Sequence, residues 1–147
     1  YGWNTPNTHH LGPSLPFYTK LYKGEAGDKW EAFADYKYIF CIQNAIPAGQ
    51  FEGDIFMAMA VGSVPIYLPP LDADEFIPKN TYIDYSEFKD HDELVSYLKK
   101  IINTEEYENY RKAGWDYLNS SKFKPFTVRQ FAEDVYSAIK THEEKSK

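Results

Sequence analysis

The sequence is poor in several features that would indicate common functions. Only Arg111 and Arg129 are arginines, and the net charge is −6, so the chain lacks the basic face that nucleic-acid-binding proteins need. The one cysteine, Cys41, cannot form an intrachain disulfide and is predicted to be a small buried residue. No apolar run approaches the roughly 20 residues of a membrane helix, and no signal peptide is recognisable. The chain starts at Tyr1 rather than Met, so we expect a fragment or a processed or trimmed form.

Motifs for phosphate binding, metal binding and nucleophilic catalysis are also missing. Neither GxGxxG nor GxxxxGKS occurs, and no Ser/His/Asp or Cys/His arrangement stands out. His9 and His10 are adjacent and have no further ligands at a recognisable spacing, so no metal site is predicted. The catalytic residues are therefore unknown from the sequence.

What the sequence does contain is a strand–helix–strand pattern. Residues 36–43 form an apolar run without helical period, residues 52–62 suit a helix ending near Gly62, and residues 64–68 form a second apolar run before Pro69 and Pro70. Such a short crossover predicts two parallel strands with a right-handed connection. We expect one α/β domain over residues 1–147, with an irregular segment at 1–28 and a short helix at 29–34 in which Trp30 and Phe33 share a face.

The C-terminal half is predicted to be mainly helical. A third strand is expected at 81–83, and Asp90 with Glu93 resembles a capping box that opens a helix. Thr104 is predicted to start another helix through residue 118, and Thr127 to start the last one. Residues 141–147 are expected to be a solvated tail.

A ligand site is predicted beyond the carboxyl ends of the parallel strands. The loops concerned are residues 43–53 and the segment after Tyr67, and the helix after the first loop points its N-terminus to the same place. Free N–H groups and the helix dipole make such an end suitable for an anion. Asp72, Asp74 and Glu75 form an acidic cluster in the second loop, which faces this cleft or is simply solvated.

Three stretches together resemble the C-terminal half of the family 10 glycosyltransferases, the α-1,3/α-1,4-fucosyltransferases. They are YKYIFCIQN, GSVPIY and EFIPKNTYIDYSEFKDHDELVSYLKKI, and the resemblance covers roughly residues 1–120. It implies a GT-B fold of two Rossmann-like domains, of which this chain would be the donor-binding one, with helices on both faces of a parallel sheet. It also implies a GDP-fucose donor, a glycan acceptor and inverting transfer without a required metal. The acceptor domain would precede this chain, so the chain alone is expected to be inactive.

The resemblance assigns the donor-binding positions one by one. Lys37 and Asn44 match the family pattern. Counted without gaps, the family's Glu-Asn pair becomes Gln43-Asn44, and its Thr-Glu-Lys becomes Glu52-Gly53-Asp54. The family's lysine is thus replaced by an acid, and a like charge about 4 Å from a phosphate costs on the order of 4 kcal/mol at an effective dielectric near 20.

The two acids leave three interpretations open. Glu52 and Asp54 are favourable first-turn acids on a helix with nothing bound. Alternatively, a divergent transferase holds its donor differently, with a divalent cation bridging acids and phosphates as one means. The third interpretation is a non-catalytic interaction or assembly domain that retains the half-fold. The compartment follows from the source: the Golgi lumen for a eukaryotic protein, the cytoplasm for a bacterial or viral one.

Overall fold

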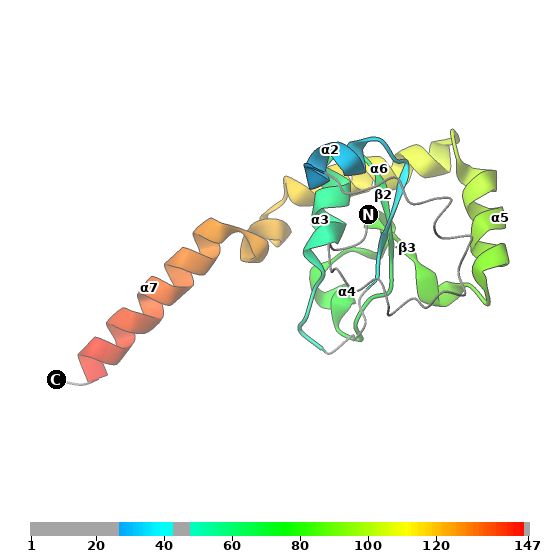
Figure 1. The fold of residues 1–147 in the computed structure, drawn as a ribbon. Helices are drawn as coiled ribbons and strands as arrows, with labels where there is room; N and C mark the ends of the chain where they lie inside the picture. Colours follow the sequence, from blue (N-terminus) through cyan, green and yellow to red (C-terminus); the bar gives the residue numbers. More distant parts are fainter. Residues whose placement is uncertain (1–26, 43–47, 146–147) are drawn as a thin grey trace, which may run out of the picture.

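The computed structural model describes residues 27–42 and 48–145 (Figure 1). The elements are α2 (Lys29–Ala34), β1 (Tyr38–Cys41), α3 (Gly53–Ala60), β2 (Val64–Tyr67), α4 (Ala73–Phe76), η2 (Lys79–Thr81), β3 (Ile83–Asp84), η3 (Tyr85–Glu87), α5 (His91–Ile101), α6 (Glu105–Leu118), η4 (Ser121–Phe126) and α7 (Val128–Lys145). The predicted irregular segment, apart from residues 27 and 28, lies outside the described residues, as do His9 and His10.

The described strands form one parallel sheet in the order β1-β2-β3. Tyr38 pairs with Val64 and Cys41 with Tyr67, while Ile66 pairs with Ile83. The helix α3 connects β1 to β2, so the predicted parallel βαβ unit is confirmed. The third strand, predicted at 81–83, is only two residues long and begins at Ile83.

Alternate residues of the strands feed two hydrophobic clusters, one on each face of the sheet. Ile39, Cys41 and Tyr67 pack on one face with residues of α2 and α3, and with Tyr117 near the end of α6. The other face carries Val64, Ile66 and Ile83, covered mainly by Leu94 and Ile101 of α5 and by Tyr107 near the start of α6. Period-two alternation of this kind is what a strand buried on both faces requires. The predicted α/β class with helices on both faces is therefore confirmed.

Helix α6 crosses the amino ends of β1 and β2 (Figure 1). The Tyr107 hydroxyl donates to the carbonyl of Lys37 at 3.3 Å, and Arg111 Nε donates to the carbonyl of Gly62 at 2.8 Å. Gly62 follows α3 with φ of 82°, a left-handed conformation that suits glycine after a helix C-terminus. These contacts fix the amino edge of the sheet, so the carboxyl edge is the one left for loops.

The helix starts agree with the sequence in two of three cases. Asp90 accepts from the backbone N–H of Glu93 at 2.9 Å, and Glu93 accepts in return from that of Lys89 at 2.7 Å. The Thr127 hydroxyl likewise accepts from the Gln130 N–H at 3.2 Å. Thr104 precedes α6 as predicted, but its side chain makes no cap hydrogen bond to that helix. It donates instead to the carbonyl of Ile101 at 2.6 Å.

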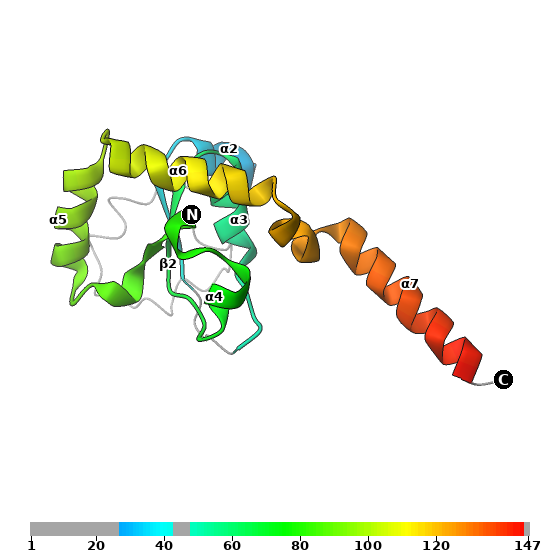
Figure 2. The ribbon, with the colours of Figure 1, turned by 180° about the vertical axis from the view of Figure 1, so that it is seen from behind.

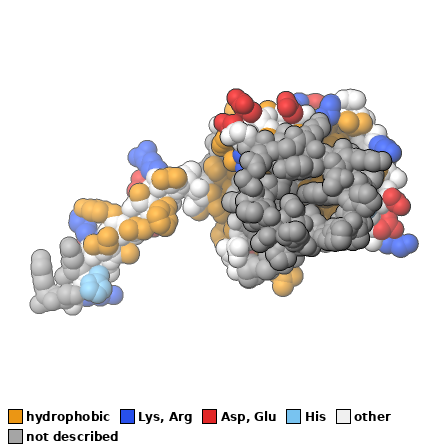
Figure 3. All heavy atoms as spheres, in the orientation of Figure 1, with side chains coloured by type: hydrophobic (Ala, Val, Ile, Leu, Met, Phe, Trp, Pro, Cys, Tyr) orange, Lys and Arg blue, Asp and Glu red, His pale blue; other side chains and the backbone are white. Residues whose placement is uncertain are grey.

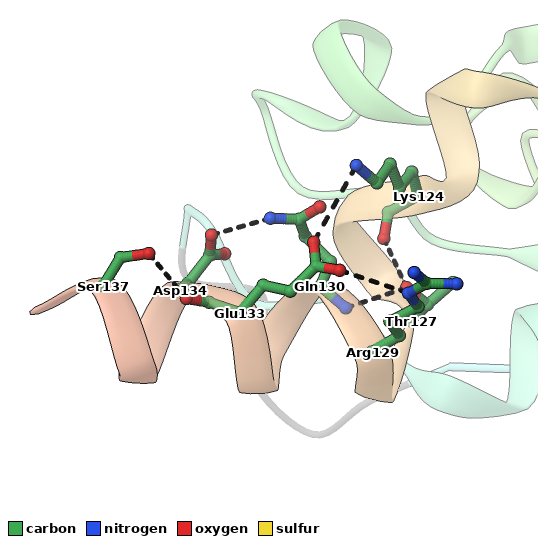
Figure 4. A network of polar contacts seen from close by, with 7 residues as sticks. All are labelled: Lys124, Thr127, Arg129, Gln130, Glu133, Asp134 and Ser137. Atoms are coloured by element: carbon green, nitrogen blue, oxygen red, sulfur yellow. Dashed lines mark hydrogen bonds and ion pairs between the residues drawn. The ribbon is translucent and has the colours of Figure 1, made fainter.

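Helix α7 projects away from the rest of the domain (Figures 1 and 2). Its base is held by a polar network in which Glu133 pairs with Arg129 at 3.1 Å and with Lys124 at 4.0 Å (Figure 4). The helix runs to Lys145, so residues 141–145 of the expected solvated tail are helical. Its apolar stripe is exposed, as the orange side chains along the arm show (Figure 3); the large exposed members are Val128, Phe131, Val135, Tyr136 and Ile139.

Candidate functional site

The predicted anion-binding end of α3 lies at the carboxyl edge of the sheet. Glu52 precedes the helix in extended conformation, and its side chain makes no cap hydrogen bond. The backbone N–H groups of the first turn, those of Gly53 and Asp54, have no intrahelical partner by geometry. With the helix dipole, they present a positive end to whatever lies beyond β1 and β2.

Asp54 is not a bare acid at this end. Its Oδ1 lies 2.5 Å from Lys29 Nζ, which comes from α2, 25 positions earlier in the chain. The side chains of Lys29 and Asp54 are 44% and 26% exposed, so the pair borders solvent. The expected repulsion between Asp54 and a phosphate is therefore offset by Lys29, a cation that no sequence motif predicted.

The strand ends next to the Lys29–Asp54 pair carry buried side chains. Cys41 ends β1 and Tyr67 ends β2, and both side chains are almost fully buried. Burial raises the pKa of the Cys41 thiol, with Asp54 and Glu52 adding to the rise and Lys29 opposing it. Burial also raises the pKa of Tyr67 to about 12, although a hydrogen bond from the backbone of Glu52 acts in the opposite direction. Cys41 is thus a buried thiol, as predicted, and remains protonated at neutral pH.

The acidic cluster after Tyr67 is divided between two environments. The short helix α4 carries Asp74 and Glu75, which are exposed, and Asp74 pairs with Lys79 at 3.0 Å. Asp72 precedes α4, is half-buried, and adds to the raised pKa of Tyr67, which places it near the candidate site. Its buried Oδ1 has no hydrogen-bond partner among the described residues.

Lys37 is held far from the other predicted positions that the structure describes. It precedes β1, and its Nζ donates to Asn103 Oδ1 at 2.6 Å while lying 5.2 Å from the centroid of the Tyr107 ring. The four residues of β1 separate it from the carboxyl edge, a distance of about 13 Å at roughly 3.3 Å per residue. The structure therefore brings Glu52, Gly53 and Asp54 together but leaves Lys37 at the opposite edge. Gln43 and Asn44 lie outside the described residues.

A cluster of phenylalanines supports the loop that leads into α3. The Phe51 ring meets Phe76 of α4 at 5.2 Å and Phe126 of η4 at 5.5 Å, both edge to face. Phe126 also lies 4.8 Å from Phe56 of α3. Aromatic pairs of this geometry contribute about 0.5–1.5 kcal/mol beyond area burial. The high aromatic content was the available sequence signal, but it did not indicate which rings would meet.

Within residues 27–42 and 48–145 no three His, Cys, Asp or Glu side chains are grouped so that they could hold a metal ion. Asp54 is already paired with Lys29.

Among the residues that the structure describes, no helix is long and apolar enough to cross a bilayer.

A family model matches most of the chain. Residues 17–143 match the model of "Glycosyltransferase family 10 (fucosyltransferase) C-term". The chain belongs to this family. The predicted resemblance is confirmed, and the match extends through most of α7.

Curated relatives are fucosyltransferases by name. An α-(1,4)-fucosyltransferase of Arabidopsis thaliana is 31% identical over 56% of this chain. A GDP-fucose protein O-fucosyltransferase 3 of Gallus gallus is 30% identical over 57%, and a 4-galactosyl-N-acetylglucosaminide 3-α-L-fucosyltransferase 9 of Mus musculus is 25% identical over 75%. The matches span only 22%, 18% and 36% of those proteins. A solved α1,3-fucosyltransferase structure aligns with a TM-score of 0.49 and 21% identity over 67% of this chain and 27% of that one.

Proposed function

We propose that this chain is the donor-binding half of a GT-B fucosyltransferase. It would bind GDP-fucose, and a preceding domain would bind the glycan acceptor. The observation that carries the proposal is the uncapped first turn of α3, which opens at the carboxyl edge of a parallel sheet in a chain of this family. A diphosphate is the part of the donor that such a helix end would recognise.

The proposed reaction needs little chemistry from this half. The acceptor hydroxyl oxygen forms a bond to the anomeric carbon of fucose, and the bond from that carbon to the diphosphate oxygen breaks. GDP leaves with the electron pair, and a base on the other domain takes the hydroxyl proton. Negative charge therefore grows on the diphosphate, and fixed N–H dipoles at the first turn of α3 stabilise it without reorganising.

Calorimetric titration of the 147-residue chain tests the donor half of this proposal. GDP should bind, guanosine should bind more weakly because it lacks the phosphates, and magnesium should change neither affinity. Equal affinity for GDP and guanosine would contradict recognition of the diphosphate at α3. Incubation with GDP-fucose and an acceptor glycan should give no product, and measurable transfer would show that the missing half is not required.

One observation favours a second candidate, an interaction domain that retains the half-fold. The exposed stripe of α7 leaves Phe131 and Val135 bare in the described structure. Sedimentation of the chain beside the Phe131→Asp variant tests this. A concentration-dependent assembly that the substitution abolishes would support interaction as a function, and a monomer at every concentration would count against self-assembly.

A further inference from the structure

We propose that Lys29 supplies the cation for the donor diphosphate, in the place where the family pattern has a lysine and this chain has Asp54. The inference rests on the proposed donor-binding function. Asp54, an acid, lies in the first turn of α3, and the cation that pairs with it, Lys29, comes from α2.

Lys29 is held in place by its helix rather than carried on a free surface segment. Asp28 caps α2 by accepting from the Trp30 N–H at 2.7 Å. At the other end, Ser63 Oγ hydrogen-bonds to the carbonyls of Phe33 at 3.1 Å and of Tyr36 at 2.5 Å. These contacts fasten α2 to the turn that follows α3, so the two helices keep a fixed relation.

The ammonium group of Lys29 retains donor capacity after it pairs with Asp54. A lysine has three N–H donors; the described contacts use one of them on Asp54 Oδ1, and the ammonium also lies 5.5 Å from the centroid of the Phe33 ring. The other two are available to phosphate oxygens at a point that borders solvent. The opposing effect of Lys29 on the pKa of the Cys41 thiol places the same charge within electrostatic range of the end of β1.

The local charge decides whether an anion is tolerated. Without Lys29, the two acids Glu52 and Asp54 would place two negative charges on the end of α3. With Lys29, the ion pair is neutral, and Glu52 and the half-buried Asp72 are the acids that remain near the positive helix end. A phosphate that displaces or shares the Asp54 contact gains a charge-assisted hydrogen bond.

Titration of GDP into four variants of the chain tests this role. Lys29→Gln should weaken GDP binding by about ten- to a hundredfold, the range of a hydrogen bond to a charged group. Lys29→Arg should keep most of the affinity. Asp54→Asn should tighten GDP binding, because it frees the ammonium. The exchange Lys29→Asp with Asp54→Lys should bind within a few fold of the parent, because the cation stays at the same point.

A matched control is Lys112→Gln, which breaks the Lys112–Asp116 pair on α6 and should leave GDP affinity unchanged. Circular dichroism verifies that each variant is folded. If Lys29→Gln does not fold, the exchange variant Lys29→Asp with Asp54→Lys still tests the role of the cation. If the parent binds GDP and both Lys29→Gln and Lys112→Gln bind equally well, Lys29 has no such role and the donor site stands. If only variants with lysine at position 54 bind, the site stands but Lys29 does not compensate. If no form binds, the proposed function fails and the role of Lys29 fails with it.

Discussion

The substitution Gly114→Ala in α6 adds one methyl group, which should favour the helix but crowd Met59 of α3. A Cβ placed at this glycine would lie 3.0 Å from Met59 Cγ and 3.3 Å from Met59 Cβ on α3. The Cγ can move with the side chain, but the Cβ is fixed to the helix backbone. Gly114→Ala gains about 1 kcal/mol of helix propensity, while overpacking costs about 1–3 kcal/mol. We therefore expect a net loss of about 1 kcal/mol in the free energy of unfolding.

The same substitution should change sign when Met59 is shortened. Met59→Ala alone should cost about 2–5 kcal/mol, since Met59 is 2% exposed. In that background Gly114→Ala loses the contact at 3.0 Å but still meets the β-carbon of position 59 at 3.3 Å, so it should stabilise by at most about 1 kcal/mol, which gives a coupling energy of at most about 2 kcal/mol between the two positions. Urea denaturation of the four proteins measures each value. An additive cycle, with Gly114→Ala stabilising in both backgrounds, would refute the close approach of α3 and α6.

Three further results are expected. Burial raises the pKa of Tyr67 and of Tyr117 from 10 to about 12, so the unfolded chain loses these protons first. The contribution of these two tyrosines to the free energy of unfolding should stay level below pH 10 and fall between pH 10 and 12 by at most about 3 kcal/mol for each group; denaturation of Tyr67→Phe should show a smaller fall over that range. Asp90→Ala should cost about 1 kcal/mol by removing the cap of α5, and Thr104→Ala should cost less because its side chain does not cap α6; thermal denaturation compares them. Phe126→Ala should cost about 2–3 kcal/mol in urea denaturation, since this half-buried ring contacts four other phenylalanines, and an unchanged midpoint would contradict that packing.

The fold was predictable where local and global signals agree. The Val64–Tyr67 strand is apolar on both faces, and as the middle strand of the described sheet it is buried throughout. The run at 36–43 is apolar too, but β1 lies at the edge of the described sheet and its Phe40 is 56% exposed. Asp90 combined a cap residue with a glutamate three positions later, so the start of α5 was fixed locally. Periodicity in α7 predicted its helix correctly, but periodicity does not say what covers the apolar face.

The short elements were less predictable because they depend on contacts distant in sequence. Trp30 and Phe33 were expected to share a face of α2, but the sequence did not predict that Phe33 would be buried and Trp30 50% exposed. A helix of six residues is too short for its period to decide which side faces the core. The acids after Tyr67 were considered together as a loop, whereas α4 exposes two of them and turns Asp72 inward.

The candidate site shows the same limit in chemical terms. The position of Asp54 at the start of α3 followed from the sequence, because a helix was predicted there and its first turn could be counted. Its charge environment did not follow, because Lys29 is 25 positions away and belongs to another element. Lys37 shows a related limit: it lies next to an apolar run that leads to the candidate site, but it precedes the strand and so lies at the opposite edge of the sheet. Proximity in sequence to a strand says nothing about which end of the strand a side chain occupies.

The two edges of the sheet differ in how their polar groups are used. At the amino edge, Lys37 donates to Asn103 and lies over the Tyr107 ring, and Arg111 donates to the Gly62 carbonyl and to Glu108, so both cations contact groups of the domain itself. At the carboxyl edge, the first turn of α3 has unpaired amides by geometry, and Lys29 has donors beyond the one that it gives to Asp54. A group that retains hydrogen-bonding capacity can gain from a ligand, while a saturated group can only exchange one partner for another. The unpaired amides at the first turn of α3, more than the charge of any one residue, are therefore the physical reason to place a diphosphate at the carboxyl edge.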